Sequence, residues 1–536
     1  MFKKFLINIL LSCILILFFI LSVGSAMRES LTFDEIVYLQ AGRTEVLQHI
    51  FTLDPYNPPL IREISMLPYI FNNEFYTNEM FVFNHVLWGR VSIIFLGAAL
   101  LIAVFVFVKK YLGEKEAIFA IFLLALEPNI LANSHYVTID IGLTLFFFLS
   151  YSLFILFLQN PSYRATILLS LSIGLGMATK ILFIPYFLLT TALVWFFQYK
   201  SKTFSTVMRN WKKLILGGLI TLFVIWGIYF FSWHIFIKER EDTSRVSSKV
   251  MQFAKHHNLK IVADAIFFLE IQPIPLGDYG AIVKNNVLRG LHSDKCFFLG
   301  KYYDTCRWYF MPVNFLLKTP PPLLIYFSVS VFLFIKQRKR SAIQYLLLFP
   351  ILGTLFSSIL FRVQPLVRYI LPIFPFIVIF SALSISFWQK TPIRKLIFYI
   401  LLVWYIAGTL FSFPHFISYA NELNFGHKYF LLQDSNLDWG QSLPDARKFM
   451  LQHKESLIMF SYFGRDNGDL YGLKSNKSYG SYKNNEICQF HSIHAYGKTQ
   501  ITLISITNWS ICGYNMNPRY TKQKIKSVIG ESILVF

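Results

Sequence analysis

The chain has 536 residues, of which 55% are hydrophobic, 18% aromatic and only 15% charged. This composition excludes an ordinary soluble domain, in which about a quarter of the residues are charged, and indicates a polytopic membrane protein. The formal net charge of +21 does not indicate a nucleic-acid partner, because Lys and Arg fall mostly in short segments between apolar runs, as topology signals do.

Apolar runs long enough to cross a bilayer predict about eleven transmembrane helices. They begin near residues 5, 87, 117, 139, 165, 182, 214, 320, 342, 369 and 396. The basic segments that share one side are Lys3 and Lys4, Lys109 and Lys110, Arg164, 200–213, 336–340 and 390–395. By the positive-inside rule this side is cytoplasmic, so the N-terminus is predicted to lie inside and the C-terminus outside.

The stretch 165–197 is too long for one ordinary crossing and slightly short for two. A single crossing would put the basic segment 336–340 outside, against the charge rule. We therefore interpret this stretch as two short helices, with Lys180 between them near the outer surface.

The predicted topology divides the chain into a transmembrane domain, 1–413, and an extracytoplasmic C-terminal domain, 414–536. Two outer loops of the first domain, 25–86 and 234–318, are also long. In the first of these loops, apolar residues at helical spacing over Phe33–Ile50 predict an amphipathic helix along the membrane interface.

The C-terminal domain shows a mixed pattern. The runs Leu457–Tyr462 and Ile501–Ile506 predict strands, and Leu443–His453 predicts a helix. The fold class is therefore an all-α polytopic membrane protein with a small mixed α/β extracytoplasmic domain at its end.

The cysteines agree with this orientation. Cys296 and Cys306 share one outer loop, Cys488 and Cys512 share the C-terminal domain, and Cys13 lies within a span. Two local disulfides are consistent with an oxidising compartment, and free buried thiols are the alternative, because spacing alone does not fix connectivity.

An adjacent acidic pair, Asp34 and Glu35, follows the first apolar span by a short stretch. Ionisable groups close to hydrocarbon are costly to desolvate, which makes a catalytic pair at the membrane surface the leading hypothesis. The alternative is a structural role at the start of a helix.

Several short motifs, taken in chain order, resemble a known enzyme family. The first are Phe33-Asp34-Glu35, Asn57-Pro58-Pro59-Leu60, Glu127-Pro128-Asn129-Ile130 and Thr138-Ile139-Asp140. The later ones are 288–291, 298–300, 308–310, 318–320, 368–372 and 434–441. Together they are similar to the protein O-mannosyltransferase-like glycosyltransferases, including the lipid A aminoarabinose transferases. The resemblance implies a GT-C-type helical bundle that uses a polyprenyl-phosphate sugar.

The resemblance implies an inverting transfer, in which an acceptor hydroxyl attacks the anomeric carbon and the lipid phosphate departs. An attacking hydroxyl needs a base to accept its proton. By analogy with the family, Asp34 is the predicted base and Glu35 orients the acceptor or the substrate.

Asp140 begins the fourth predicted span from the outside. Related enzymes place an acidic residue there, which implies that Asp140, together with Asp34, can hold a divalent metal cation that bridges the carrier phosphate. The alternative is that Asp140 and Thr138 cap the helix.

The departing phosphate carries negative charge, so cations at the outer membrane face are predicted to hold it. The candidates are Arg368, Lys318, Lys180 and Arg62. Arg368 is the first choice because a planar guanidinium can grip a phosphate through two bonds. The alternative for each is snorkelling to lipid headgroups.

Two further residues are predicted to contact substrate. Asn57 stands where the family commonly has His or Lys, so it supplies hydrogen bonds but no charge. Trp439 is predicted to stack on a sugar, with a capped loop before the 443–453 helix as the alternative.

The expected partners are a sugar carried by undecaprenyl phosphate or a similar lipid, an acceptor that is a protein, lipid A or surface glycan, and membrane lipids. The expected location is the bacterial inner membrane, with a periplasmic C-terminal domain. No P-loop or dinucleotide motif is evident, so no nucleotide cofactor is expected. The alternative function is a multispanning lipid or solute transporter, which the lack of an internal repeat disfavours.

Overall fold

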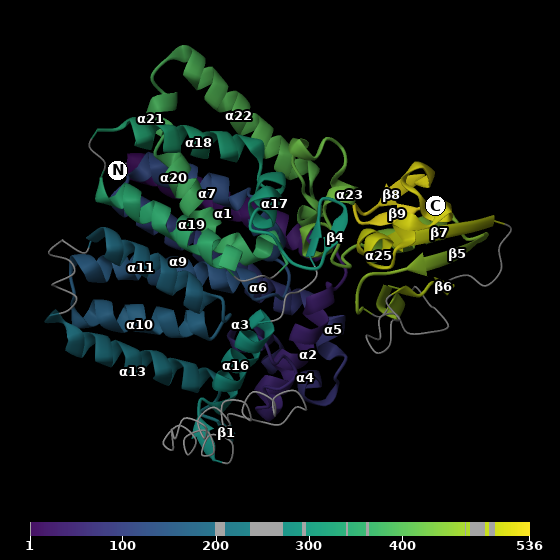
Figure 1. The fold of residues 1–536 in the computed structure, drawn as a ribbon, viewed down its shortest axis with the longest axis horizontal. Helices are drawn as coiled ribbons and strands as arrows, with labels where there is room; N and C mark the ends of the chain where they lie inside the picture. The colour runs from purple at the N-terminus through teal and green to yellow at the C-terminus, as the bar shows by residue number, and fades with distance from the viewer. Residues whose placement is uncertain are drawn as a thin grey trace.

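The computed structural model describes residues 2–198, 209–235, 272–291, 296–338, 341–360, 364–466, 468–471, 488–492 and 499–536. Over these residues the chain is mostly helical, with a five-stranded sheet near its C-terminus. Figure 1 shows long helices side by side, with the sheet at one end of this bundle and the N-terminus at the opposite end.

Each predicted apolar run is helical. The helices of the first half are α1 (Phe2–Ala26), α2 (Phe33–Gln48), α3 (Leu60–Met66), α4 (Glu74–Thr77), α5 (Phe81–Asn84), α6 (Val86–Tyr111), α7 (Glu114–Ala125), α8 (Pro128–Asn133), α9 (Asp140–Gln159), α10 (Tyr163–Met177), α11 (Phe183–Gln198) and α13 (Trp211–Ile228). Those of the second half are α16 (Gly277–Leu291), α17 (Phe310–Lys318), α18 (Pro321–Lys336), α19 (Ala342–Leu360), the 3₁₀ helix η2 (Val367–Ile373), α20 (Phe374–Ala382), α21 (Ile385–Trp388), α22 (Pro392–Phe411), α23 (Lys428–Leu431), α24 (Leu443–Gln452) and α25 (Ile506–Ile511).

The number of membrane spans is confirmed only in part. Among the described residues, 6 helices are long and apolar enough to cross a membrane, or 7 if α17 and α18, bent by 115°, form one span. The other predicted spans are shorter apolar helices, such as α10, α11 and the segment Val367–Ala382. The chain is thus a multi-pass membrane protein, and the count of about eleven spans stays a prediction.

The stretch 165–197 forms two helices, as predicted. Ser162 accepts a hydrogen bond from the Ala165 amide and starts α10, and a turn that contains Lys180 leads into α11. A Cβ atom at Gly176 would lie 2.3 Å from the Phe183 ring, so the close approach of these helices requires glycine there.

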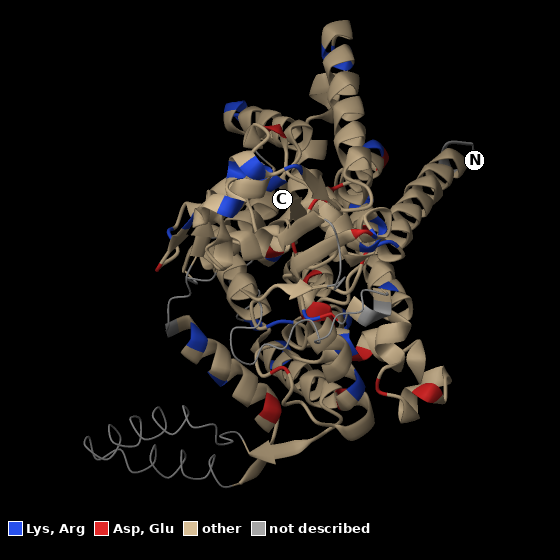
Figure 2. Cartoon of the chain, turned by 90° about the vertical axis from the view of Figure 1, so that its right-hand side faces the viewer, with Lys and Arg blue, Asp and Glu red and all other residues tan. Residues whose placement is uncertain are grey.

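The core of the bundle is mostly apolar. Every residue of α20 is buried, and α20 packs against α7 and α18 while α9 packs against α6 and α10. Such all-round burial explains why these runs are continuously hydrophobic rather than amphipathic. Charged side chains gather elsewhere: Figure 2 shows α22 rising at the top, tan along most of its length, with Lys and Arg near its far end.

The C-terminal sheet confirms the predicted strands. The strands are β5 (Ser456–Ser461), β6 (His491–Ser492), β7 (Thr499–Ser505), β8 (Ser527–Ile529) and β9 (Ile533–Val535). Their order is β6-β5-β7-β9-β8, and β5 pairs with β7 in parallel. Helix α24 packs against this sheet through Leu443, Ala446 and Met450. Two short antiparallel strand pairs stand apart, β1 (Trp233–Ile235) with β2 (Pro273–Pro275) and β3 (Cys296–Phe298) with β4 (Lys301–Tyr303).

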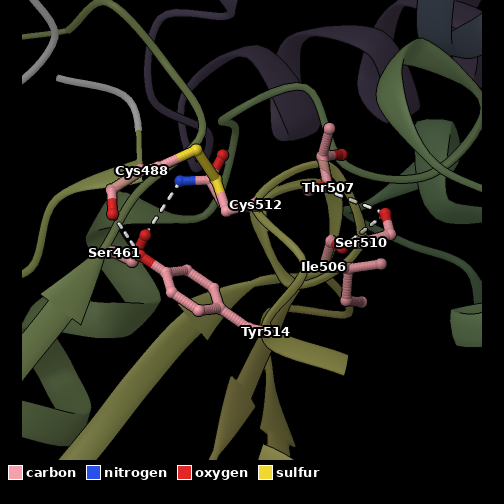
Figure 3. Close-up of a disulfide and its surroundings, with 8 residues drawn as sticks. Ser461, Cys488, Ile506, Thr507, Ser510, Cys512 and Tyr514 are labelled. Carbon is pink, nitrogen blue, oxygen red and sulfur yellow. Dashed lines mark hydrogen bonds between the residues drawn. A yellow bond between two sulfur atoms is a disulfide. The ribbon is translucent and has the colours of Figure 1, made fainter. Parts of the chain in front are cut away.

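Of the two alternatives left open for the cysteines, the structure has the two local disulfides. Cys296 bonds to Cys306 beside the β3–β4 hairpin, and Cys488 bonds to Cys512 in the C-terminal domain. Figure 3 shows the second disulfide next to Tyr514, whose hydroxyl donates to the Cys488 carbonyl. Each bridge therefore closes a local loop outside the bundle.

Candidate active site

Four predicted site residues meet in one charged cluster. Arg368 Nη1 lies 2.7 Å from Asp34 Oδ2 and 3.9 Å from Asp140 Oδ2. Lys180 Nζ lies 2.6 Å from Asp140 Oδ1. We call these four residues the Asp34 cluster. It joins the start of α2, the start of α9, the α10–α11 turn and η2, which lie far apart in the sequence.

Asp34 is the most open carboxylate of this cluster. Its side chain is 24% exposed, whereas that of Asp140 is 1% exposed. The first turn of α2 holds Asp34 in place because Thr32 and Glu35 form a capping box at the helix start. Asp34 itself is thus left free of capping bonds and can face an incoming group.

Asp140 does not cap α9. The N-cap residue of this helix is Ile139, with no side-chain cap hydrogen bond, and the Thr138 hydroxyl has no hydrogen-bond partner among the described residues. The carboxylate of Asp140 instead pairs with Lys180 through Oδ1, while its Oδ2 atom is buried without a hydrogen bond. This placement fits an ionic site better than the capping alternative.

Arg368 lies beside two aromatic rings. Its guanidinium carbon lies 4.4 Å from the centre of the Trp439 ring and 5.4 Å from that of Tyr369. Such stacking fixes the plane of the guanidinium. The Nε atom of Arg368 is buried and has no hydrogen-bond partner among the described residues, so one donor of a fixed fork stays available.

Trp439 therefore lies beneath the cation. It is 1% exposed, and it also meets the Tyr136 ring edge to face, with centroids 5.9 Å apart. The structure brings this residue to the Asp34 cluster but does not present its ring on an open surface. Its predicted stacking on a sugar stays a prediction.

Two more acidic or polar groups approach the cluster. Burial raises the pKa of the Asp434 carboxyl, and the Arg368 charge opposes this rise while the Asp34 charge adds to it. Asn57 Nδ2 lies 3.0 Å from Asp54 Oδ2 and 3.5 Å from the hydroxyl of Tyr38. The loop 434–441 and the turn at Asn57 thus border the site.

Glu35 lies apart from the Asp34 cluster. It is fully buried, and Arg90 donates to it from Nε at 2.9 Å and from Nη2 at 2.7 Å. The amides of Thr32 and Val137 also donate to it, each at 2.8 Å. This carboxylate is saturated with donors, which fits the structural alternative for Glu35 at the start of α2.

Lys318 and Arg62 are not brought to the cluster either. Lys318 Nζ donates to the carbonyls of Ile417, Tyr419 and Asn436 at 2.7, 2.6 and 2.8 Å. Arg62 pairs with Glu45 and Asp54, with Nη1 2.7 Å from Asp54 Oδ2. Both cations are 1% exposed, so each holds protein segments together and neither faces lipid.

The carboxylates of the Asp34 cluster do not form a binding site for a divalent metal cation in this arrangement. Arg368 and Lys180 already occupy oxygens of Asp34 and Asp140. No group of three or more His, Cys, Asp or Glu side chains that could hold a metal occurs in the part of the chain that the structure describes. The metal requirement stays a prediction.

A second ionic network, not found from the sequence, joins the bundle to the C-terminal domain. Glu29 accepts from the Tyr136 hydroxyl at 2.7 Å and lies 2.7 Å from His135 Nε2 and 2.9 Å from His415 Nδ1. The other nitrogen of His415 lies 3.1 Å from Asp445 Oδ2, on α24. His415 thus connects the loop after α1 with the C-terminal domain.

We expect this connection to weaken at high pH. Burial would lower the pKa of His415, but its bonds to Asp445 and Glu29 outweigh burial and raise that pKa from 6.5 to about 9. A raised pKa stabilises the folded state fully below the unfolded value and stops doing so as the pH passes about 9. The loss is on the order of 3 kcal/mol, measurable as a fall in thermal stability between pH 7 and pH 9.5.

The matched control is His415→Gln, which cannot titrate. This variant should be less stable than the wild type at neutral pH and should lose most of the pH dependence over the same range. An equal fall in the variant would show that other groups cause it.

The chain is similar to one protein family over part of its length. The model of the dolichyl-phosphate-mannose-protein mannosyltransferase family matches residues 79–229, whereas no curated protein sequence matches the chain. Apo ArnT from Cupriavidus metallidurans is 14% identical, with a TM-score of 0.49 over 75% of this chain and 63% of ArnT. ArnT from the same organism bound to undecaprenyl phosphate has the same identity and TM-score over 79% and 67%.

An oligosaccharyltransferase from Archaeoglobus fulgidus, tethered with an acceptor peptide, is 13% identical, with a TM-score of 0.46 over 90% of this chain and 61% of that chain. The chain spans less than two thirds of the length of this enzyme and of apo ArnT. The family match confirms that residues 79–229 resemble the protein O-mannosyltransferase-like glycosyltransferases.

Proposed function

We propose that the protein is an inverting glycosyltransferase that moves a sugar from a polyprenyl-phosphate carrier to an acceptor hydroxyl. The observation that carries this proposal is the 2.7 Å pairing of Asp34 with Arg368, which puts a carboxylate that is 24% exposed beside a cation that is 12% exposed. One site then holds both a base for the acceptor and a charge for the departing phosphate. The family match supports the same class of reaction.

In this reaction Asp34 is the base. The acceptor oxygen attacks the anomeric carbon of the sugar, and a new carbon–oxygen bond forms as the bond to the phosphate oxygen breaks. The hydroxyl proton moves to the Asp34 carboxylate, and the electron pair of the broken bond leaves with the polyprenyl phosphate. Its 24% exposure makes Asp34 the carboxylate of the Asp34 cluster that an acceptor can reach.

Arg368 and Lys180 hold the phosphate in this proposal. As the bond to the sugar breaks, negative charge grows on the phosphate, and fixed cations stabilise that charge most. The Trp439 ring beneath Arg368 keeps the guanidinium oriented before the substrate arrives, which lowers the cost of reorganisation. The buried, unpartnered Nε of Arg368 adds one donor for a phosphate oxygen.

The donor is proposed to be carried by undecaprenyl phosphate or a similar lipid, and the acceptor to be a protein, lipid A or surface glycan. We place the site at the outer face of the bacterial inner membrane, with the N-terminus inside, because basic segments such as 336–340 and 390–395 gather on the predicted inner side. The partly exposed Asp34 side chain then faces the compartment in which disulfides form.

The test is a transfer assay with purified protein in lipid nanodiscs. A panel of polyprenyl-phosphate sugars is added together with a membrane extract, and mass spectrometry follows which molecules gain the mass of a sugar. We expect one donor to be consumed and one acceptor class to gain that mass. Movement of a labelled lipid across a vesicle bilayer, with no covalent change in any molecule, would instead support a transporter.

A further inference from the structure

We propose that a cavity at the end of the bundle opposite the sheet binds the anionic headgroup of a membrane phospholipid. The cavity has a volume of about 290 Å³ and lies where the end of α18, the start of α19 and the α20–α22 segment meet. Its lining residues are Ser330, Leu333, Phe334, Lys336, Gln337, Gln344, Leu383, Ser386, Phe387 and Lys390.

The charged side chains that line this cavity, among the described residues, are positive. Lys336 and Lys390 are its two charged lining residues, and both side chains are exposed. Neither ammonium forms an ion pair with any residue that the structure describes. Two unpaired cations on one concave surface attract an anion more strongly than the same charges on a flat surface.

Part of the cavity lining is apolar. Leu333, Phe334, Leu383 and Phe387 line it beside the lysines, and Phe334 packs against the rings of Tyr345 and Phe380. A phospholipid presents a phosphate directly next to hydrocarbon, so it matches both halves of this lining, whereas inorganic phosphate matches only the cationic half. Basic pockets between transmembrane helices are sites of this kind.

The walls are held in place by contacts between helices. Gln344 at the start of α19 donates to Gln337 at 3.1 Å, which ties α18 to α19. On the other side, the guanidinium of Arg394 lies 4.1 Å from the centre of the Phe387 ring. A headgroup between Lys336 and Lys390 would therefore join α18 to the α21–α22 segment.

This site is distinct from the Asp34 cluster. Lys390 precedes α22, whereas the other end of α22 leads to His415 beside the C-terminal domain. In Figure 1, the α18–α21 end of the bundle lies opposite the sheet. The bound lipid would stabilise the helical packing without contacting the sugar donor.

The experiment measures lipid retention by native mass spectrometry of the full chain, after transfer from nanodiscs into detergent. The nanodiscs contain phosphatidylglycerol or phosphatidylcholine. The wild type should retain phosphatidylglycerol in preference to phosphatidylcholine. The double variant K336Q/K390Q should retain roughly tenfold less phosphatidylglycerol, because each lysine contributes to attraction of an anionic lipid.

The matched control is K110Q/K395Q, which removes the same charge from two exposed lysines that do not line the cavity. This control should retain phosphatidylglycerol like the wild type, as should K336R/K390R. Equal losses in the control and in K336Q/K390Q would overturn the proposal. Equal retention of the two lipids by the wild type would also overturn the proposal, and this measurement stands even if K336Q/K390Q fails to fold. Displacement of the bound lipid by millimolar inorganic phosphate would overturn it as well.

Discussion

Replacing Asp34 by Asn should reduce sugar transfer roughly 1,000-fold, which is the usual effect of removing a general base. Asn has nearly the same shape and can still accept a hydrogen bond from Arg368, which lies 2.7 Å from Asp34, but it cannot take a proton from the acceptor hydroxyl. The rate loss should therefore appear in kcat at saturating donor. The KM for the donor should change little, because the cations Arg368 and Lys180 remain.

The control for this experiment is Asp304→Asn, at an exposed position in the segment between β4 and α17. This variant should transfer sugar at the wild-type rate, and both variants should elute as folded protein and unfold near the wild-type temperature. Near-normal turnover by Asp34→Asn would reject the base assignment. A misfolded Asp34→Asn protein would instead point to a structural role for the pairing with Arg368.

The parts of the fold that the sequence predicts correctly follow from local patterns. Helices α10 and α11 follow from hydrophobic length and the charge rule, and the strands β5 and β7 follow from short apolar runs. The disulfide between Cys296 and Cys306 joins residues only 10 positions apart. The span count is harder, because α10 and α11 lie within the bundle as helices too short to identify by length alone.

Only part of the candidate site can be predicted from the sequence, because charged residues near span ends can have different roles. Asp34, Asp140, Lys180 and Arg368 were each predicted as outer-face residues and do converge. Lys318 also lies near a predicted outer span end, but backbone carbonyls surround its ammonium group. A charge near a span end can hold a substrate or hold the protein together, and only the fold shows which partner is close.

The sequence also contains a feature that predicts a structural role for Glu35, namely the arginine that pairs with it. Arg90 stands in the first turns of the apolar helix α6 and is fully buried. An arginine in such a position needs an internal counter-charge, and Glu35 was an available carboxylate. The pairing across 55 positions follows from tertiary packing, as does the network of Glu29 with His415 across 386 positions.

Replacing Glu35 by Gln should unfold the start of α2 rather than remove a chemical step. Arg90 would stay buried with no carboxylate, and breaking a buried ion pair on one side costs about 3–5 kcal/mol. Glu74→Gln, an exposed position on α4, is the matched control and should leave stability unchanged. Thermal unfolding in detergent measures the loss of stability. The transfer rate per folded molecule measures any effect on the chemical step.

The double variant Glu35→Gln/Arg90→Met separates the structural role of Glu35 from a chemical one. Removing both charges together leaves no unpaired ion, so this variant should recover part of the stability that Glu35→Gln loses. The recovery should be incomplete because the carbonyls of Ala26, Glu29 and Ser30 lose the hydrogen bonds that Arg90 donates to them. If Glu35 only supports α2, the folded double variant should also recover transfer, because Asp34 regains its position in the first turn. If Glu35 instead orients the acceptor, stability should return while transfer stays low, since the carboxylate is still missing.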